Sequence, residues 1–328
     1  MKAEKDALHC VQENAEVDVV LTALPVLAAS PATPVDAIER ETGLSKEVIR
    51  KWETRYGFPR PLRDENGDRL YPNDQVFQLR LIRSLISSGM RPHQVVGRPQ
   101  AELASMVQEA QPADICIDSP DVLTVFDALQ THDQYRLRQI LRRMLNRQGL
   151  ADFVNTTMAN LNKRVGDLWL QGSIQVFEEH LYTGVATSVL TEAIIDLDTQ
   201  TSSQTALLTT APGEIHSLGL MMANAVLALE GVHCLWLGPQ IPVDEIAMAA
   251  TRCSADIVAL SFSAAFPGRD ANAFLRRLAA AMDGSCEIWA GGTGVSRLPP
   301  MAGVRLFGDL RSVPAALTGL RSGLAAGP

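Results

Sequence analysis

The chain has 328 residues, 46% of them hydrophobic and 20% charged, which suits two or three domains of ordinary size and excludes global disorder. Its formal net charge of -8 argues against a protein that binds nucleic acid over its whole surface. The charge is unevenly distributed, because residues 35–98 carry 12 basic and 9 acidic side chains whereas residues 99–328 carry 15 and 23. We therefore expect a nucleic-acid-binding surface only within residues 35–98.

The five cysteines are odd in number and widely spaced, without a Cys-x-x-Cys pair. This pattern predicts buried free thiols in a reducing cytoplasm. No stretch approaches the roughly 20 apolar residues of a membrane span, and the N-terminus has no signal-peptide pattern. We expect a cytoplasmic protein without a membrane partner.

Composition and hydrophobic period divide the chain into five segments. Residues 1–34 end in a Pro/Ala-rich run and are interpreted as a leader or linker, and residues 35–98 as a first folded unit. Residues 99–120 are interpreted as a second linker with one short helix. Residues 121–200 show a helical period throughout, whereas residues 201–328 alternate short apolar runs with helical stretches.

The first folded unit opens with two predicted helices, Val35–Glu41 and Lys46–Tyr56, joined by the tight turn Thr42-Gly43-Leu44-Ser45. Ser45 is expected to cap the second helix, which is rich in Lys and Arg. Helix, glycine turn and basic helix indicate a helix-turn-helix. A hairpin signal at Asn66-Gly67 then predicts a β-wing. Basic helices by themselves are more often solvated faces, so the order of these elements carries the prediction.

Residues 35–98 resemble the DNA-binding domain of MerR-type transcription regulators. The resemblance lies in Thr-Gly-Leu-Ser, Ile-Arg-x-Trp-Glu-x-Arg-Tyr-Gly, Pro-x-Arg and Asn-Gly-x-Arg-x-Tyr, with Asp68 as an extra acid at the wing tip. It implies a winged helix-turn-helix that acts as a pair on a two-part operator of double-stranded DNA. The side chains that it assigns to DNA are Lys46, Arg50, Arg55, Arg63, Arg69 and Tyr71.

Two apolar stripes at helical spacing predict consecutive helices within residues 121–200. A break at Gly172-Ser173 separates them, and Ser173 is expected to cap the second helix. Three or four such helices indicate a small antiparallel bundle, that is, a four-helix bundle. The stripes are Val154, Met158, Leu161, Val165 and Leu168, and then Phe177, Leu181, Val185 and Val189.

The C-terminal segment predicts a parallel five-stranded sheet of the flavodoxin-like, Rossmann-like type, with helices on both faces. Ligands of such sheets bind beyond the carboxyl ends of the strands. His216 lies in the loop after the first predicted strand, and Glu214 is placed to accept a hydrogen bond from one ring nitrogen and fix the tautomer. A lone histidine beside a carboxylate is more often a capped surface group than a metal ligand.

The pattern Glu-x-His-x-x-Gly, then Ser-x-Ser, then Gly-Gly, with 41 and 27 residues between the motifs, resembles the cobalamin-binding signature of flavodoxin-like B12 domains. The resemblance implies that His216 ligates cobalt in place of the cofactor's dimethylbenzimidazole, and that the nucleotide tail enters the sheet past the serines and glycines. Glu214 stands where Asp is more usual, and Ser263 where Thr or Leu is. The cofactor-binding residues implied here are Glu214, His216, Gly219, Ser261, Ser263, Gly291 and Gly292.

Trp-x9-Glu-His across the Gly-Ser turn brings Trp169, Val176, Glu179 and His180 to one end of the bundle. Trp169 as ordinary core and His180 as a satisfied interior histidine are open alternatives. The spacing, and the domain order, resemble the B12-dependent photoreceptor repressors of the CarH/LitR type. That resemblance implies that Trp169 shields the upper face of the corrin, and that the other three line a pocket for the adenosyl group of adenosylcobalamin.

The resemblance further implies that light cleaves the Co–C bond and dissociates a DNA-bound dimer or tetramer. In the light-sensing members a histidine follows the tryptophan, but here the residue is Leu170, which cannot ligate cobalt. Another photoproduct, B12 sensing without light, and an additional chromophore remain open.

A B12-dependent methyltransferase or mutase subunit is the rival from another class. The N-terminal region leaves no room for the barrel of roughly 250 residues that such chemistry uses. A ligand-free interaction module that keeps the fold is a third alternative. We expect a non-enzymatic transcription regulator, a repressor, that binds adenosylcobalamin and DNA.

Overall fold

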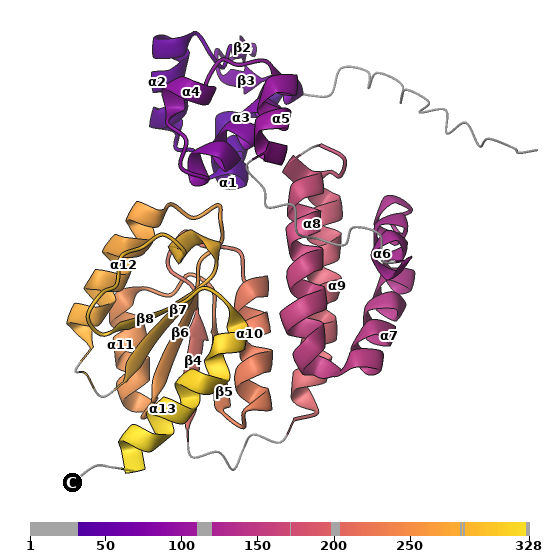
Figure 1. The fold of residues 1–328 in the computed structure, drawn as a ribbon. Coiled ribbons are helices and arrows are strands. Elements are labelled where there is room, and N and C mark those ends of the chain that lie inside the picture. Colours follow the sequence, from indigo (N-terminus) through magenta and orange to yellow (C-terminus); the bar gives the residue numbers. More distant parts are fainter. Residues whose placement is uncertain are drawn as a thin grey trace, which may run out of the picture. The chain divides into compact units, whose positions relative to one another are not determined.

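A computed structural model describes residues 32–109, 120–170, 172–197, 204–282, 284 and 286–325 of the chain. In chain order, these residues form a winged helix-turn-helix domain, a helical bundle and an α/β domain (Figure 1). The predicted leader lies outside the described residues except for its last three positions, as do Cys10, Cys116 and residues 110–119 of the predicted second linker.

The first domain is a winged helix-turn-helix, as predicted. Helices α1 (Val35–Thr42) and α2 (Lys46–Tyr56) flank a turn in which Gly43 has a φ of 66°. The Ser45 hydroxyl accepts a hydrogen bond from the Val48 N–H at 3.3 Å and so caps α2. The wing is a three-stranded antiparallel sheet in the order β1 (Thr33–Pro34), β3 (Arg69–Tyr71), β2 (Leu62–Arg63). Because β1 pairs with β3, residues 33 and 34 belong to this domain rather than to a leader.

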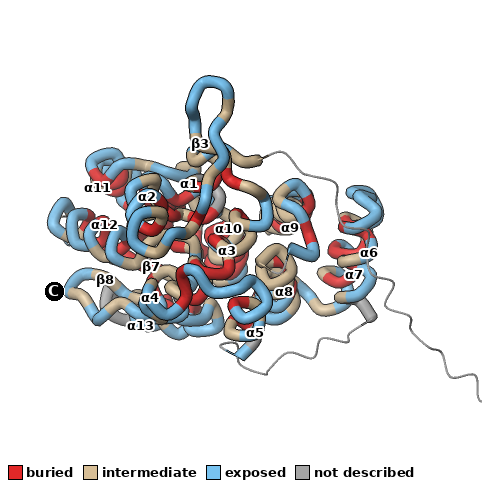
Figure 2. Tube along the Cα trace, turned by 90° about the horizontal axis from the view of Figure 1, so that it is seen from above, coloured by how far each residue is buried: buried red, intermediate tan, exposed pale blue. Residues whose placement is uncertain are grey.

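Three further helices complete this domain: α3 (Asn73–Ser87), α4 (Pro92–Val95) and α5 (Gln100–Glu109). Leu103 and Val107 of α5 are buried in the same core as Trp52 and Leu79. Helix α5 falls in the predicted linker, but its buried apolar face makes it part of the first domain. In contrast to the buried face of α5, the turn between β2 and β3 of the wing is exposed (Figure 2).

The bundle consists of α6 (Pro120–Gln130), α7 (Gln134–Asp152), α8 (Ala159–Leu170) and α9 (Val176–Ile195), with a π-helix at Phe153–Met158 between α7 and α8. The first predicted stripe packs into the core, although the π-helix interrupts the regular period. Two details of the prediction are wrong. Gln175, not Ser173, caps α9, because its N–H donates to the Glu178 side chain. Phe177 is 56% exposed, so the second stripe begins only after it.

The third domain contains the predicted parallel sheet, in the order β5-β4-β6-β7-β8. Alternate residues of its central strands enter two separate cores, one shared with α10, α13 and the bundle and the other with α11 and α12. Figure 1 shows the same two layers on either side of the sheet. The strands are β4 (Thr205–Thr209), β5 (His233–Gly238), β6 (Ile257–Ser261), β7 (Glu287–Gly291) and β8 (Val304–Phe307); the helices are α10 (Leu218–Leu229), α11 (Val243–Arg252), α12 (Gly268–Ala281) and α13 (Val313–Ala325).

The strand order places a topological switch point at β4. The chain leaves β4 to form β5 on one side and later returns to form β6 on the other. The loops after β4 and β6 therefore diverge at the carboxyl edge of the sheet, which is where ligands bind in such folds. These loops hold the motifs with His216 and Ser263.

Two sequence-based expectations concern the whole chain. The described cysteines are free, but Cys253 is exposed, so the prediction that the thiols are buried is wrong for this residue. Within the described ranges, no helix is both long and apolar enough to cross a membrane.

Candidate functional site

The outer face of α2 presents a continuous basic surface. Arg50, Lys51, Thr54 and Arg55 line a shallow depression there. Arg50 and Arg55 are exposed, as a phosphate-binding surface requires. Lys46, at the start of α2, forms an ion pair with Asp36, and this hydrogen bond raises the pKa of the lysine.

The wing divides its predicted DNA contacts into outer and inner residues. Arg63 is exposed, and its guanidinium donates to the Gly67 carbonyl at 2.7 Å across the hairpin. Arg69 and Tyr71 instead converge on Glu53 of α2, with distances of 3.2 Å and 2.6 Å to its two carboxylate oxygens. Tyr71 is fully buried, so its assignment to DNA is corrected: it fixes the wing against α2. Burial and Glu53 raise the pKa of its hydroxyl, which remains a donor.

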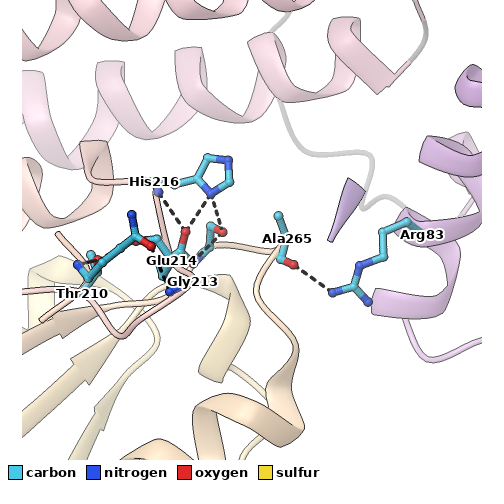
Figure 3. A network of polar contacts seen from close by, with 8 residues as sticks. Arg83, Thr210, Gly213, Glu214, His216 and Ala265 are labelled. Atoms are coloured by element: carbon cyan, nitrogen blue, oxygen red, sulfur yellow. Dashed lines mark hydrogen bonds and ion pairs between the residues drawn. The ribbon is translucent and has the colours of Figure 1, made fainter. Parts of the chain in front are cut away.

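His216 is held by a buried carboxylate at the carboxyl edge of the sheet. Glu214 is only 1% exposed, and one of its oxygens lies 2.7 Å from Nδ1 of His216 and 2.9 Å from the His216 backbone nitrogen. The other oxygen accepts from the backbone N–H and hydroxyl of Ser263, at 2.7 Å and 2.8 Å. In Figure 3 the second ring nitrogen of His216 points away from this network. Nδ1 is thus engaged, and Nε2 is the nitrogen directed outward.

These hydrogen bonds set the protonation of the pair. The hydrogen bond that His216 donates to Glu214 raises the pKa of His216, although burial opposes it, and the charge of Glu179 adds to the increase. Burial would raise the pKa of Glu214, but the bonds from His216 and Ser263 outweigh it, so that pKa falls below its usual range. An anionic Glu214 behind the imidazole makes His216 a better donor toward a metal.

A second set of contacts fixes the loop that carries Glu214. The buried Thr210 hydroxyl donates to the Glu214 carbonyl at 2.6 Å and accepts from the Gln240 N–H at 2.9 Å. The Gln240 side chain accepts from the Gly213 N–H at 3.1 Å. Sequence reasoning missed Gln240. Its φ of 64° lies in the left-handed region, which Gly and Asn usually occupy, so the residue type gave no signal of this turn.

The three glycines predicted to bind the cofactor differ in what would surround an added side chain. A Cβ on Gly219 would lie 2.8 Å from the Ser261 hydroxyl, so these two residues are in close contact. A Cβ on Gly292, whose φ is 96°, would lie 2.3 Å from the Phe262 carbonyl. Gly292 is thus required by loop packing. A Cβ on Gly291 would lie 3.7 Å from Cβ and the carbonyl oxygen of Phe307 on the neighbouring strand β8, an ordinary packing contact.

The four predicted bundle residues lie around the α8–α9 junction. Val176 and Glu179 are half-buried, and Glu179 accepts from the Thr183 hydroxyl at 2.7 Å. His180 is exposed and pairs with Glu179 at 2.8 Å, so it is not an interior histidine. Trp169 is half-buried on the bundle core, where Arg80 of α3 lies 4.6 Å from its ring centroid.

Comparisons with known proteins find family matches for the domains that carry the two candidate sites. The MerR HTH family regulatory protein model covers residues 34–97, and two B12 binding domain models cover residues 124–194 and 204–312. The chain thus combines a MerR-type HTH domain with B12-binding domain matches over the bundle and the sheet. These family matches support DNA and cobalamin as its partners.

Two curated relatives are similar to this regulator over most of their length. The HTH-type transcriptional repressor CarH of Myxococcus xanthus is 28% identical over 260 residues, which are 76% of this chain and 85% of the relative. The repressor CarA of the same organism is 26% identical over 238 residues, which are 70% and 75%. A solved corrinoid protein for monomethylamine from Methanosarcina barkeri has 17% identity and a TM-score of 0.49, and the match covers 60% of this chain and 96% of that one. The repressor relatives support the prediction of a regulator rather than an enzyme.

The basic face of α2 generates a prediction on salt dependence. Arg50→Ala and Arg55→Ala should each weaken binding to duplex DNA of any sequence and reduce the slope of log affinity against log salt by about 1, because each removes one phosphate contact. Fluorescence anisotropy at several salt concentrations measures the slope. Arg98→Ala, a control on the same domain whose arginine pairs with Glu102, should leave the slope unchanged. An unchanged slope in both α2 variants would place the DNA contact elsewhere.

The Glu214–His216 pair generates a prediction on proton binding. Glu214→Gln should lower the pKa of His216, because the amide keeps the size of the side chain but removes the charge that stabilises the imidazolium. NMR titration of the His216 ring nitrogens in the cofactor-free wild type and variant measures it. A His216 pKa that stays the same or rises would contradict the role given to Glu214.

Proposed function

We propose that this protein is a repressor that binds adenosylcobalamin through His216. Its affinity for DNA changes when the upper ligand of the cofactor is lost. The observation that carries the proposal is the arrangement of His216. Its Nδ1 is occupied by a buried carboxylate at 2.7 Å, and its Nε2 points outward at the switch point of a parallel sheet. This is the geometry of a preoriented metal ligand.

The residues at the sheet edge fit a cobalamin. His216 offers one nitrogen, which is the number of protein ligands needed by a metal that a macrocycle already holds. The imidazole is 46% exposed, so it can be reached from outside without unfolding the loop. Ser263, which we had expected beside the nucleotide tail, instead supports Glu214, and through it the ligand.

The bundle residues support the adenosyl form of the cofactor. Helix α10 begins two residues after His216 and packs against α9, the helix that carries Glu179, so the bundle lies beside the imidazole. A corrin bound to Nε2 would therefore have Glu179, His180 and Trp169 on its upper side. A carboxylate and an imidazole can hydrogen-bond the ribose and adenine of an adenosyl group, while Val176 and Trp169 supply apolar surface.

Leu170 favours a second candidate, a B12 sensor that works without light or with another chromophore. Adenosylcobalamin supplies a Co–C bond that light cleaves. Leu170 lies beside Trp169 and has no donor atom for the metal thereafter. Dissociation of a DNA-bound dimer or tetramer, as in the light-dependent mechanism, would then depend on the position of the bundle rather than on a second histidine ligand.

The cobalamin site is tested by absorption spectroscopy of the reconstituted protein. The wild-type protein should bind added adenosylcobalamin with a spectrum of nitrogen-ligated cobalt, and His216→Ala should lose that spectrum, while His180→Ala retains it. Binding to the wild type should weaken as the pH falls through the raised pKa of His216, because cobalt needs the neutral imidazole. A wild-type protein that does not bind the cofactor would refute the proposal.

Light sensing is tested on DNA. The adenosylcobalamin complex should bind an operator, selected by this protein from a random DNA library, about tenfold more weakly after illumination, the size of a typical coupling free energy. Gel-shift assays and light scattering report binding and size. If illumination changes neither and cobalamin addition alone changes both, the light-independent sensor is correct.

A further inference from the structure

The DNA-binding domain contacts the helical bundle at the residue proposed to cover the corrin. The guanidinium of Arg80, on α3, lies 4.6 Å from the ring centroid of Trp169. One turn earlier on α3, the ring of Phe77 packs against Gly172, where an added Cβ would lie 2.8 Å from the ring. Helix α3 is thus fitted closely to the end of α8 and the turn that follows it.

The same domain also contacts the loops of the α/β domain. Arg83 of α3 donates to the Ala265 carbonyl at 3.0 Å, and Arg297 of the α/β domain donates to the Ser88 carbonyl at 2.7 Å. Two glycines permit this approach. A Cβ on Gly43, in the turn before α2, would lie 2.5 Å from the Ala265 oxygen, and one on Gly89 would lie 2.8 Å from the Arg297 guanidinium.

The contact at Ala265 is close to the support of the cobalt ligand. Ala265 lies two residues after Ser263, whose N–H and hydroxyl both bind Glu214. The turn between them is closed by a hydrogen bond from the Phe266 N–H to the Ser263 carbonyl at 3.1 Å. Figure 3 shows the resulting series of contacts from His216 through Glu214 to the loop of Ala265 and on to Arg83.

The two contacted parts are the two walls of the proposed cobalamin cleft. Trp169 belongs to the bundle wall, and Ala265 and Arg297 to the wall formed by the sheet edge. Helix α10, which begins two residues after His216, packs against α9 of the bundle, so a corrin held by Nε2 would lie between the walls. A rigid domain that holds both walls keeps all its contacts only while the distance between the walls stays the same.

We propose that the DNA-binding domain is a latch across the cobalamin cleft, held by Arg80, Arg83 and Arg297, and that cobalamin bound at His216 loosens it. The existence of the latch rests on the contacts alone. Its loosening rests on the proposed function, because it needs the cofactor to enter between the walls. Since coupling between two equilibria is reciprocal, variants that open the latch should bind cobalamin more tightly.

Hydrogen–deuterium exchange of the full-length, cofactor-free protein tests the latch itself. Arg83→Ala and Arg297→Ala should each increase the exchange of the loop around Ala265 and of the segment around Ser88. Arg297 lies on the α/β domain, so its variant opens the latch without disturbing the core of the DNA-binding domain. Arg277→Ala, which removes an exposed arginine of α12, is the matched control and should change neither segment. Unchanged exchange in both latch variants would overturn the latch.

Titration with adenosylcobalamin in the dark tests the loosening. The Arg83→Ala and Arg297→Ala variants should bind the cofactor about fivefold or more tightly than wild type, the lower end of typical coupling. Equal affinities in wild type, control and latch variants would refute the coupling. A wild type that binds no cobalamin would refute the proposed function, while the exchange experiment would still decide on the latch.

Discussion

The proposed cobalamin site depends on one buried charge. Glu214 is a carboxylate with 1% of its surface exposed, and an isolated charge at such a position would cost several kcal/mol. Four hydrogen bonds compensate this cost, two from His216 and two from Ser263, so the carboxylate is stable only when both loops are in place. The same bonds orient the imidazole. The stability of the loop structure and the direction of the proposed metal ligand therefore have one physical cause.

The sheet brings these loops together because of its strand order. Glu214 and His216 follow β4, and Ser263 follows β6, 49 residues further along the chain from Glu214, yet β4 and β6 are neighbours. The turn at Ala265 extends this arrangement to the DNA-binding domain. A signal at the cofactor can thus reach α3 and the turn before α2 through a small number of short contacts, and no long-range distortion of the sheet is needed.

Sequence reasoning predicted what is local or periodic. It predicted the bounds of α2, the Ser45 cap, the five strands and the residues of the His216 motif, because period, turn chemistry and motif spacing lie within short segments. It was wrong where a residue distant in the sequence determines the burial or the backbone conformation of a side chain or loop. Tyr71 is buried because Glu53 lies beside it, and Gly292 is needed because the Phe262 carbonyl approaches it. The linker assignment of α5 failed since only the core formed with α3 shows that Leu103 is buried.

The central claim is that Nε2 of His216 is the lower ligand of cobalt. Electron paramagnetic resonance of the protein reconstituted with cobalt(II) cobalamin tests it most directly, because the nuclear spin of the ligating nitrogen splits the cobalt lines. In protein labelled with ¹⁵N-histidine and loaded with unlabelled cofactor, each line should split into two, and His216→Ala should lose this pattern. Lines split into three in the labelled protein would show that the cofactor's own ¹⁴N base is still the ligand and would contradict the account.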